Sequence, residues 1–346
     1  MPNKKLIYIG HNDGLNNSTH IYNAFSLLYK NCELINLNKY YKNYYEWTIF
    51  HKVLYRIKFF IHFKYKLVLN LYRNQPDVVI VNQLFCFNIL ELAVLRLVTK
   101  KCKILFITLD SLHQLKKASP FFKKKISMFN FVIHTKAQDI ELYKLWNIKY
   151  LLFNQGFSQP KFKLENKTDK ELEVVFIGNY MPKRSKMLNV LINNYRFKNT
   201  RILIAGRDWK NKLKSTNPKH QIVNPLFGDD YYQTLSQSKV VLSFFNETAK
   251  DITTTRINEL LIVPSIILTE SNSLMKEYFK NEDQLFQNTE ELLNNLLKLL
   301  NLDNKLYLKY LKNQELLSSL INNLCWDEEI KNLVKNIEEY EEYISN

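Results

Sequence analysis

Short apolar runs rich in β-branched residues alternate along the chain with longer segments in which apolar residues have helical spacing. In the first half these runs occur at 6–10, 78–82, 104–109, 131–134 and 150–153. The first run is followed by a loop-like stretch over 11–19 and by helical spacing over 21–29. Alternation of strand and helix predicts a parallel β-sheet that helices cover on both faces.

A second series of apolar runs follows the polar, charged stretch 161–171, which we interpret as a linker between domains. These runs lie at 173–177, 201–205, 240–244 and 265–269. Since 346 residues exceed the usual size of one hydrophobic core, we predict an α/β protein with two Rossmann-like, doubly wound parallel-sheet domains facing across a cleft. Their expected bounds are 1–165 and 172–324, and the amphipathic, acidic stretch 325–346 predicts a helix that could pack back on the first domain.

The basic residues are concentrated in the first half of the chain. The net charge is +16, but residues 1–170 hold 27 Lys and Arg against 10 Asp and Glu, and the remaining residues hold 22 against 23. A half with a charge of +17 indicates an anionic partner, which could be nucleic acid, a phospholipid surface or a phosphorylated acceptor. AT-rich coding bias is the competing explanation for a chain so rich in Lys and Asn.

Hydropathy indicates a cytoplasmic protein that at most associates with the inner face of the cytoplasmic membrane. The longest apolar region, 78–98, is interrupted by polar residues that exclude a conventional membrane-spanning helix. The start of the chain has no long apolar stretch of the kind that a signal peptide needs. The four cysteines are far apart, and no Cys or His cluster has metal-ligand spacing, so we predict no metal site.

Loops that follow the predicted strands of the second half carry glycines and cations. Gly178 follows the run 173–177 and precedes Lys183 and Arg184, and a guanidinium matches the geometry of a phosphate. Arg207 follows the next run, and Phe227 stands before a predicted helix whose loop could hold a nucleotide base. Taken alone, the loop with Lys183 and Arg184 could equally be an exposed basic turn, and the signals at Arg207 and Phe227 are weak in isolation.

The strongest constellation is the segment 251–259, which reads DITTTRINE. A helix that begins within 253–255 would present free N–H groups at Thr254 and Thr255 to a diphosphate, with Arg256 in its first turn. Glu259 then lies on the same helical face as Thr255 and Arg256, where its carboxylate can accept hydrogen bonds from both ribose hydroxyls. Such a site would need no metal.

These segments resemble the donor domain of GT-B glycosyltransferases, and in particular the CgeB-like (spore-maturation-protein-like) group. The matching pieces are FIGNYMPKRSKML, LIAGRDW, PLFGDDYYQTLSQSKVVLSF, DITTTRINELL and IILTESNSLMKEYF. The resemblance implies that Asp251 contacts the donor sugar and Glu259 the ribose, and that Arg184 and Arg256 neutralise the diphosphate. The sequence departs from the family pattern at 260–265, where it reads LLIVPS; in the family a glycine usually stands a few residues after the glutamate.

The first half resembles the family only in its architecture, so the general base for an acceptor hydroxyl stays open. His11, Asp13, Asp110 and His113 each follow a predicted strand and are the candidates. Each could instead shape a turn, cap a helix or be an ordinary histidine. The stretch 49–73 interleaves aromatic and basic residues, which suits either the surface of an anionic bilayer or a packed helix with a solvated basic face.

The sequence therefore predicts a metal-independent glycosyltransferase that uses a nucleotide-diphosphate sugar, with UDP as the expected nucleotide and no other cofactor. We expect a glycan, lipid-linked or protein acceptor in bacterial surface polysaccharide, lipopolysaccharide or glycoconjugate synthesis. We do not expect nucleic acid as a partner, because no motif for it supports the basic half. A basic nucleic-acid-binding protein and a catalytically degenerate GT-B scaffold are the alternatives.

Overall fold

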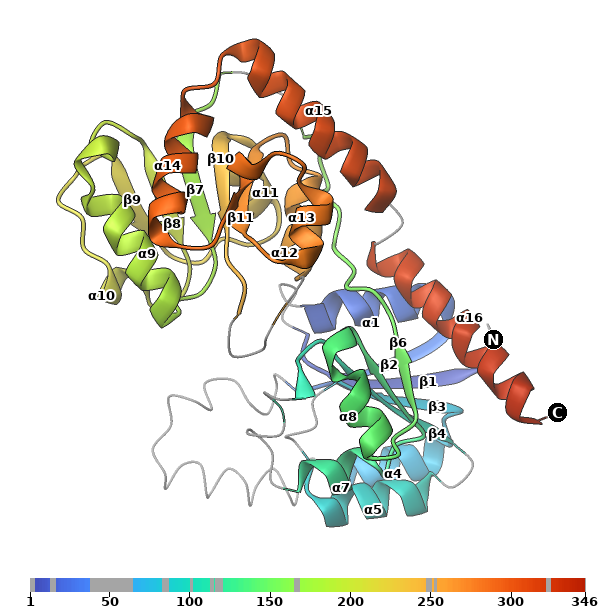
Figure 1. Cartoon of the computed structure of the whole chain (residues 1–346). Coiled ribbons are helices and arrows are strands. Elements are labelled where there is room, and N and C mark those ends of the chain that lie inside the picture. The colour runs from blue at the N-terminus through green and yellow to red at the C-terminus, as the bar shows by residue number, and fades with distance from the viewer. Residues whose placement is uncertain are drawn as a thin grey trace. The chain divides into compact units, whose positions relative to one another are not determined.

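The computed structural model describes two compact units, built from residues 1–155 with 326–346 and from residues 156–325 (Figure 1). The described residues are 4–12, 17–37, 65–82, 87–99, 102–112, 115, 121–164, 169–246, 251, 254–321 and 325–345. We call the two parts unit 1 and unit 2. The stretch 161–171, interpreted above as a linker, belongs to unit 2.

Unit 1 contains a six-stranded sheet in the order β2-β1-β3-β4-β5-β6, with parallel pairing throughout. Its strands are β1 (Lys5–Gly10), β2 (Asn31–Asn36), β3 (Val78–Val81), β4 (Lys103–Thr108), β5 (Phe131–His134) and β6 (Tyr150–Leu152). Its helices are α1 (Asn17–Leu28), α4 (Tyr65–Asn74), α5 (Ile89–Val98), α7 (Phe122–Ile126), α8 (Ile140–Leu145) and α16 (Trp326–Ser345).

Successive residues of the strands in unit 1 point to opposite faces of the sheet. Ile7 and Ile9 pack with residues of α4, α5, α7 and α8, whereas Leu6 and Tyr8 pack with residues of α1 and α16. Both sets are fully buried, which explains why these strands read as unbroken apolar runs. The last helix of the chain, α16, packs along α1 and so belongs to unit 1.

Unit 2 repeats this plan with the strand order β12-β11-β10-β7-β8-β9, again with parallel pairing. Its strands are β7 (Leu172–Ile177), β8 (Ile202–Ala205), β9 (His220–Val223), β10 (Ser238–Ser243), β11 (Ile266–Glu270) and β12 (Leu285–Phe286). Its helices are α9 (Pro182–Asn193), α10 (Trp209–Lys212), α11 (Gly228–Ser236), α12 (Thr255–Leu261), α13 (Ser273–Tyr278), α14 (Thr289–Leu300) and α15 (Asn304–Ile321).

The two faces of the sheet in unit 2 have separate cores. One core joins β7 and β10 to α9 and α14, and the other joins them to α11, α12 and α13. The sheet therefore forms the middle of a three-layer sandwich, and the connections that leave the carboxyl ends of its strands lead into these helices.

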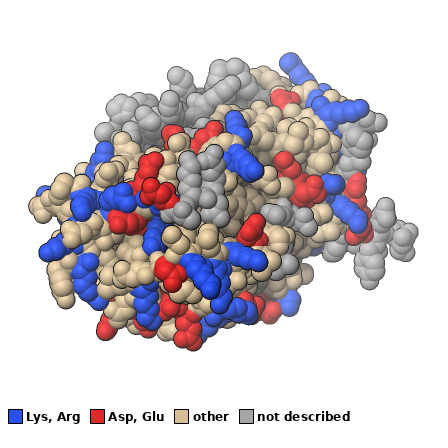
Figure 2. Space-filling model, turned by 90° about the horizontal axis from the view of Figure 1, so that it is seen from above, with Lys and Arg blue, Asp and Glu red and all other residues tan. Residues whose placement is uncertain are grey.

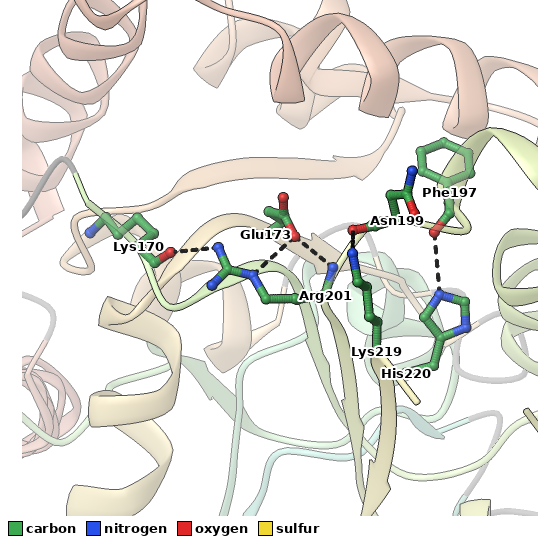
Figure 3. A network of polar contacts seen from close by, with 7 residues as sticks. All are labelled: Lys170, Glu173, Phe197, Asn199, Arg201, Lys219 and His220. Atoms are coloured by element: carbon green, nitrogen blue, oxygen red, sulfur yellow. Dashed lines mark hydrogen bonds and ion pairs between the residues drawn. The ribbon is translucent and has the colours of Figure 1, made fainter. Parts of the chain in front are cut away.

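A polar network ties together the amino ends of β7, β8 and β9 (Figure 3). One carboxylate oxygen of Glu173 accepts hydrogen bonds from the backbone N–H of Arg201 at 2.6 Å and from its Nε at 3.2 Å. The same guanidinium donates to the carbonyl of Lys170 at 3.1 Å. These charged groups are satisfied by one another and by strand ends, so this edge of the sheet is structural.

Charges of both signs are interspersed on the face of the molecule drawn in Figure 2. Mixed charge of this kind keeps a surface soluble without favouring a ligand of one sign.

His134, at the carboxyl end of β5, is buried against the rings of Tyr143 and Tyr150, at centroid distances of 4.3 and 5.6 Å. Burial lowers its pKa from 6.5 to about 4. The unfolded chain therefore takes up a proton at this residue as the pH falls below its ordinary pKa, while the folded chain does not until about pH 4.

We predict that this difference makes acid weaken the native state. The free energy of unfolding of unit 1 should fall by up to about 3 kcal/mol from His134 alone as the pH drops across this window. His134→Phe, which keeps an aromatic ring in place, should flatten that part of the profile. Urea unfolding followed by tryptophan fluorescence at stepped pH measures it, and parallel profiles for the two proteins would contradict the assignment.

Candidate functional site

The order of strands in unit 2 reverses next to β7, because the chain runs from β7 outward to β8 and β9 and then returns to β10 on the other side. In open parallel sheets a crevice opens beyond the carboxyl ends of the strands at such a point. The connections after β7, β10 and β11 leave the sheet there, and charged residues lie in or beside them: Lys183 in the first turn of α9, Asp251 after β10 and Glu270 at the end of β11.

A cavity of about 640 Å³ lies at this edge of the sheet. Its lining comes from the start of α9, the loop after β10, the end of β11, the start of α13 and the end of β12. The charged residues among its lining are Lys183, Asp251, Glu270 and Lys276. The volume suits a small-molecule ligand, and the mixed charges suit one with anionic and hydroxyl groups.

Glu270 and Lys183 form an ion pair on the wall of this cavity, with the carboxylate Oε1 and the ammonium Nζ 2.8 Å apart. The second carboxylate oxygen of Glu270 accepts a hydrogen bond from the backbone N–H of Phe245 at 2.6 Å. Glu270 is buried and therefore fixed, whereas Lys183 is about one-third exposed. The pair thus holds a cation at the mouth of the cavity.

The guanidinium of Arg184, the next residue, lies against the loops after β7 and β10. It donates to the carbonyls of Asn179 at 3.2 Å and Phe244 at 3.1 Å, which lie in the loops after β7 and β10. Burial lowers the pKa of Arg184; the charges of Glu270 and Asp251 oppose this shift, and that of Arg256 adds to it. The loops after β7, β10 and β11 and the start of α12 therefore bring two arginines and two carboxylates within electrostatic reach of one another.

Arg256 and Glu259, one turn apart on α12, form an ion pair of 3.3 Å. The hydroxyl of Tyr231, on α11, donates to the same carboxylate oxygen of Glu259 at 3.0 Å. The guanidinium of Arg256 stacks 4.5 Å from the centre of the Tyr231 ring, an arrangement that favours a cation. The predicted helical spacing of Arg256 and Glu259 is thus present in the structure, with a tyrosine from another helix as its support.

The segment before α12 supplies the remaining predicted donor-site residues. Thr254 is the residue before the helix and has extended backbone angles, and the helix itself begins at Thr255. Asp251 lines the cavity, and its backbone N–H donates to the carbonyl of Asn246 at 3.3 Å. With seven residues, α12 is short, so the side chains near its start carry more weight than its dipole.

Gly178 and Gly206 let the loops after β7 and β8 approach each other closely. The carbonyl of Gly178 accepts a hydrogen bond from the indole of Trp209 at 2.6 Å, and Gly206 has φ of +153°. Arg207 is exposed in the second loop, where its carbonyl accepts from the backbone N–H of Tyr180. Phe227 is exposed at the start of α11. Of the predicted donor-site residues, Asp251 lines the cavity described above. The others do not: Gly178, Arg184, Arg207, Phe227, Thr254, Thr255, Arg256 and Glu259.

The candidate bases belong to unit 1, and only two are among the described residues. His11 follows the carboxyl end of β1 and is half-buried. Asp110 is exposed after β4, and its backbone N–H donates to the hydroxyl of Thr108 at 3.1 Å. Asp13 and His113 lie outside the described residues. The choice among the four stays open.

Two residues that shape the site, Glu270 and Tyr231, are not among those that the sequence predicted. Glu270 is a carboxylate that directly follows the predicted strand 265–269, and this position is the sequence feature that could have identified it. Tyr231 carries no such feature, because its partners lie 25 and 28 residues further along the chain. Among the described residues, no three His, Cys, Asp or Glu side chains gather as a metal centre would require.

Comparison with known protein families also points to unit 2. Residues 184–315 match a family model described as glycosyl transferase-like, and this range includes α12 and every residue that lines the cavity except Lys183. A search of curated proteins gave no match to the chain.

Several solved structures have the same fold over nearly the whole chain. Trehalose-6-phosphate synthase OtsA is 9% identical with a TM-score of 0.68, covering 96% of this chain and 99% of its own. T4 phage BGT in complex with UDP-glucose is 15% identical with a TM-score of 0.60, covering 95% and 98%. The lipopolysaccharide outer core galactosyltransferase WaaB is 16% identical with a TM-score of 0.61, covering 97% and 99%.

The chain therefore has the GT-B fold and contains a glycosyl transferase-like region in unit 2. The predicted class, an α/β protein with two Rossmann-like parallel-sheet domains, is confirmed. Membership of the CgeB-like group stays a prediction.

The two glycines of unit 2 with positive φ allow a matched test of the loop geometry. A Cβ on Gly206 would lie 2.0 Å from the carbonyl oxygen of Gly178, whereas a Cβ on Gly228, at φ +55°, would have no atom within 4 Å. We predict that Gly206→Ala lowers the free energy of unfolding by about 3 kcal/mol or more, and Gly228→Ala by about 1 kcal/mol. Urea titration compares them, and equal losses would contradict the proposed close approach.

Proposed function

We propose that the protein transfers a sugar from a nucleotide-diphosphate sugar to a hydroxyl group of an acceptor. The observation that carries this proposal is a group of opposite charges at one end of the sheet of unit 2. Lys183, Asp251 and Glu270 line the cavity. Arg184 lies within electrostatic reach of Glu270, Asp251 and Arg256, and Arg256 is paired with Glu259. Cations suit a diphosphate, and carboxylates suit the hydroxyls of ribose and sugar.

In this proposal the cationic side chains bind the diphosphate. When the bond between the anomeric carbon and the phosphate oxygen breaks, negative charge collects on the departing diphosphate, and fixed cations stabilise it without reorganising. Arg184 and Arg256 are the partners that the family resemblance implies, and Lys183 adds a third cation that Glu270 holds in place. The start of α12, with Thr254 and Thr255, would complete this site without a metal ion.

The nucleoside would lie on the side of Glu259. Its carboxylate, fixed by Tyr231 and Arg256, would accept hydrogen bonds from the ribose hydroxyls. The loops that carry Gly178, Arg207 and Phe227 would flank the nucleoside, and Asp251 would contact the sugar from within the cavity. UDP is the proposed nucleotide, supported by the UDP-glucose that T4 phage BGT holds in its solved complex.

The acceptor would bind to unit 1, where one of His11, Asp13, Asp110 and His113 would take the proton from its hydroxyl. The acceptor oxygen then forms the new bond to the anomeric carbon, and the nucleoside diphosphate leaves. A glycan, lipid-linked or protein acceptor in the synthesis of bacterial surface polysaccharide or lipopolysaccharide is consistent with the similarity to a lipopolysaccharide galactosyltransferase. Association with the inner face of the membrane belongs to the same proposal.

Neutralising the cations should weaken binding of the diphosphate but not of the nucleoside. We expect Arg184→Gln and Lys183→Gln each to raise the Kd for UDP by about tenfold or more, because each removes a charge-assisted contact. The Kd for uridine should stay within about twofold in both variants, because uridine has no phosphate. Isothermal titration calorimetry measures both ligands.

Lys186→Gln is the matched control, since Lys186 is exposed on the same helix. If Lys183→Gln and Lys186→Gln weaken the binding of UDP equally, the general surface charge of the helix and not the site would account for the effect. If no common nucleoside diphosphate binds in a thermal-shift screen of UDP, GDP, CDP and ADP, the proposal fails.

Removing the carboxylate of Glu259 should affect both ligands. We expect Glu259→Gln to raise the Kd of uridine and of UDP alike by about tenfold, because two hydrogen bonds from ribose lose a charged acceptor. Release of UDP from UDP-sugar in the absence of an acceptor should fall in Glu259→Ala. Tight UDP binding without any turnover in the wild type, across donors and acceptors, would favour a degenerate scaffold over an enzyme.

A further inference from the structure

Three helices of unit 1, α4, α5 and α7, cover the same face of its sheet. Their buried side chains, including Leu71, Leu92 and Phe122, belong to one core with Ile7 and Val79 of the strands. In Figure 1 these helices lie side by side beneath the sheet, away from α1 and α16, which cover its other face. Their outward sides therefore point in one general direction, and we call this surface the outer helical face.

The outward side of α5 is apolar. Leu90, Val94 and Leu97 are 76%, 41% and 63% exposed, and their spacing of four and three residues aligns them in one stripe. Leu92 and Leu95, which are buried, lie on the opposite side of the same helix. An ordinary helix of a water-facing domain has polar residues where this stripe stands.

The neighbouring helices continue this pattern with aromatic residues. Tyr65 and Tyr72 are exposed at positions seven residues apart on α4, and Phe121, the residue before α7, is 74% exposed. Single exposed apolar residues are common on protein surfaces, but a contiguous group usually marks a binding surface. Tyrosine in particular suits the boundary between an apolar layer and water.

Exposed cations accompany the apolar residues. They are Arg73 at the end of α4, Arg96 on α5, and Lys123 and Lys124 on α7. The acid on α5, Glu91, binds the backbone and side chain of Asn88 in a capping box, so its carboxylate serves the helix end. The outer helical face thus combines apolar and aromatic groups with positive charge, in the half of the chain that carries the net excess of +17.

We propose that the outer helical face docks the protein onto the surface of an anionic lipid bilayer. The leucines and the phenylalanine would enter the boundary between headgroups and acyl chains, and the cations would contact anionic headgroups. No helix among the described residues is long and apolar enough to span a membrane. A second copy of the chain fits less well, since two such faces would oppose positive charge to positive charge.

One part of this inference rests on the proposed function: the acceptor would be lipid-linked, and docking of the outer helical face would bring unit 1 to the bilayer that holds it. The sequence predicted bilayer contact for residues 49–73. Residues 49–64 lie outside the described residues, and 65–73 belong to α4. The proposed surface therefore keeps the α4 part of that stretch and adds α5 and α7.

Flotation of the full chain with vesicles tests the proposal. We expect binding to vesicles of phosphatidylglycerol mixed with phosphatidylcholine, and at least about tenfold weaker binding for the double variant Leu90→Gln and Leu97→Gln, because each leucine loses its burial in lipid. The double variant Lys123→Gln and Lys124→Gln should weaken binding to these vesicles about tenfold and should reduce its dependence on salt.

Leu27→Gln is the matched control, since Leu27 is 73% exposed on α1, the helix on the opposite face of the sheet. It should bind vesicles as the wild type does. If the wild type does not bind, or if the Leu90 and Leu97 variant binds as tightly, the proposal is overturned. A wild-type dimer in light scattering that this variant dissociates would overturn it in favour of a second copy.

Titration of UDP separates this inference from the proposed function. All of these variants should keep the wild-type Kd for UDP, because α4, α5 and α7 are not part of the donor site. A wild-type protein that binds UDP but does not bind vesicles overturns the docking surface and leaves the proposed function standing. If the wild type binds vesicles but does not bind UDP, the proposed function and its lipid-linked acceptor fail, and the docking surface remains supported.

Discussion

Parallel pairing of β7 with β10 is the constraint on which the candidate site depends. Because all strands of unit 2 run the same way, the loops after β7, β10 and β11 leave at the same edge of the sheet. Residues that are far apart in the chain, such as Arg184 and Phe244, therefore come within hydrogen-bonding distance. Without this pairing the charged residues of these loops would be unrelated surface groups.

The cations at that edge of the sheet are each compensated by a neighbouring carboxylate or carbonyl group. A buried or half-buried cation is costly unless a carboxylate or carbonyl compensates it. Glu270 compensates Lys183, the carbonyls of Asn179 and Phe244 solvate Arg184, and Glu259 with Tyr231 compensates Arg256. The protein itself thus fixes the positions of these cations, and under the proposed function this would lower the cost of binding a diphosphate. In the network at the amino ends of β7, β8 and β9, by contrast, Glu173 and Arg201 pair with each other and with backbone groups of the strand ends.

Most of the strands were predictable, and those that were missed share one feature. The runs 78–82, 131–134 and 173–177 became β3, β5 and β7, because strands buried on both faces must be apolar at every position. The strands β2, β9 and β12 were not predicted. All three lie at sheet edges. In β2 and β9 polar residues such as Asn31 and His220 interrupt the apolar pattern, and β12 has only two residues. An edge strand is held by backbone hydrogen bonds that any sequence can make, so its side chains reveal little.

The sequence by itself determined the two sheets, the short helix at Thr255 and the spacing that pairs Arg256 with Glu259, because these depend on local periodicity and on neighbours within one helical turn. Only the tertiary structure decided that Tyr231 supports Glu259, that Glu270 holds Lys183, and that α4, α5 and α7 share one exposed apolar face. These contacts join residues from different elements. Which of them meet depends on the order in which strands pair, and no local pattern in the sequence encodes that order.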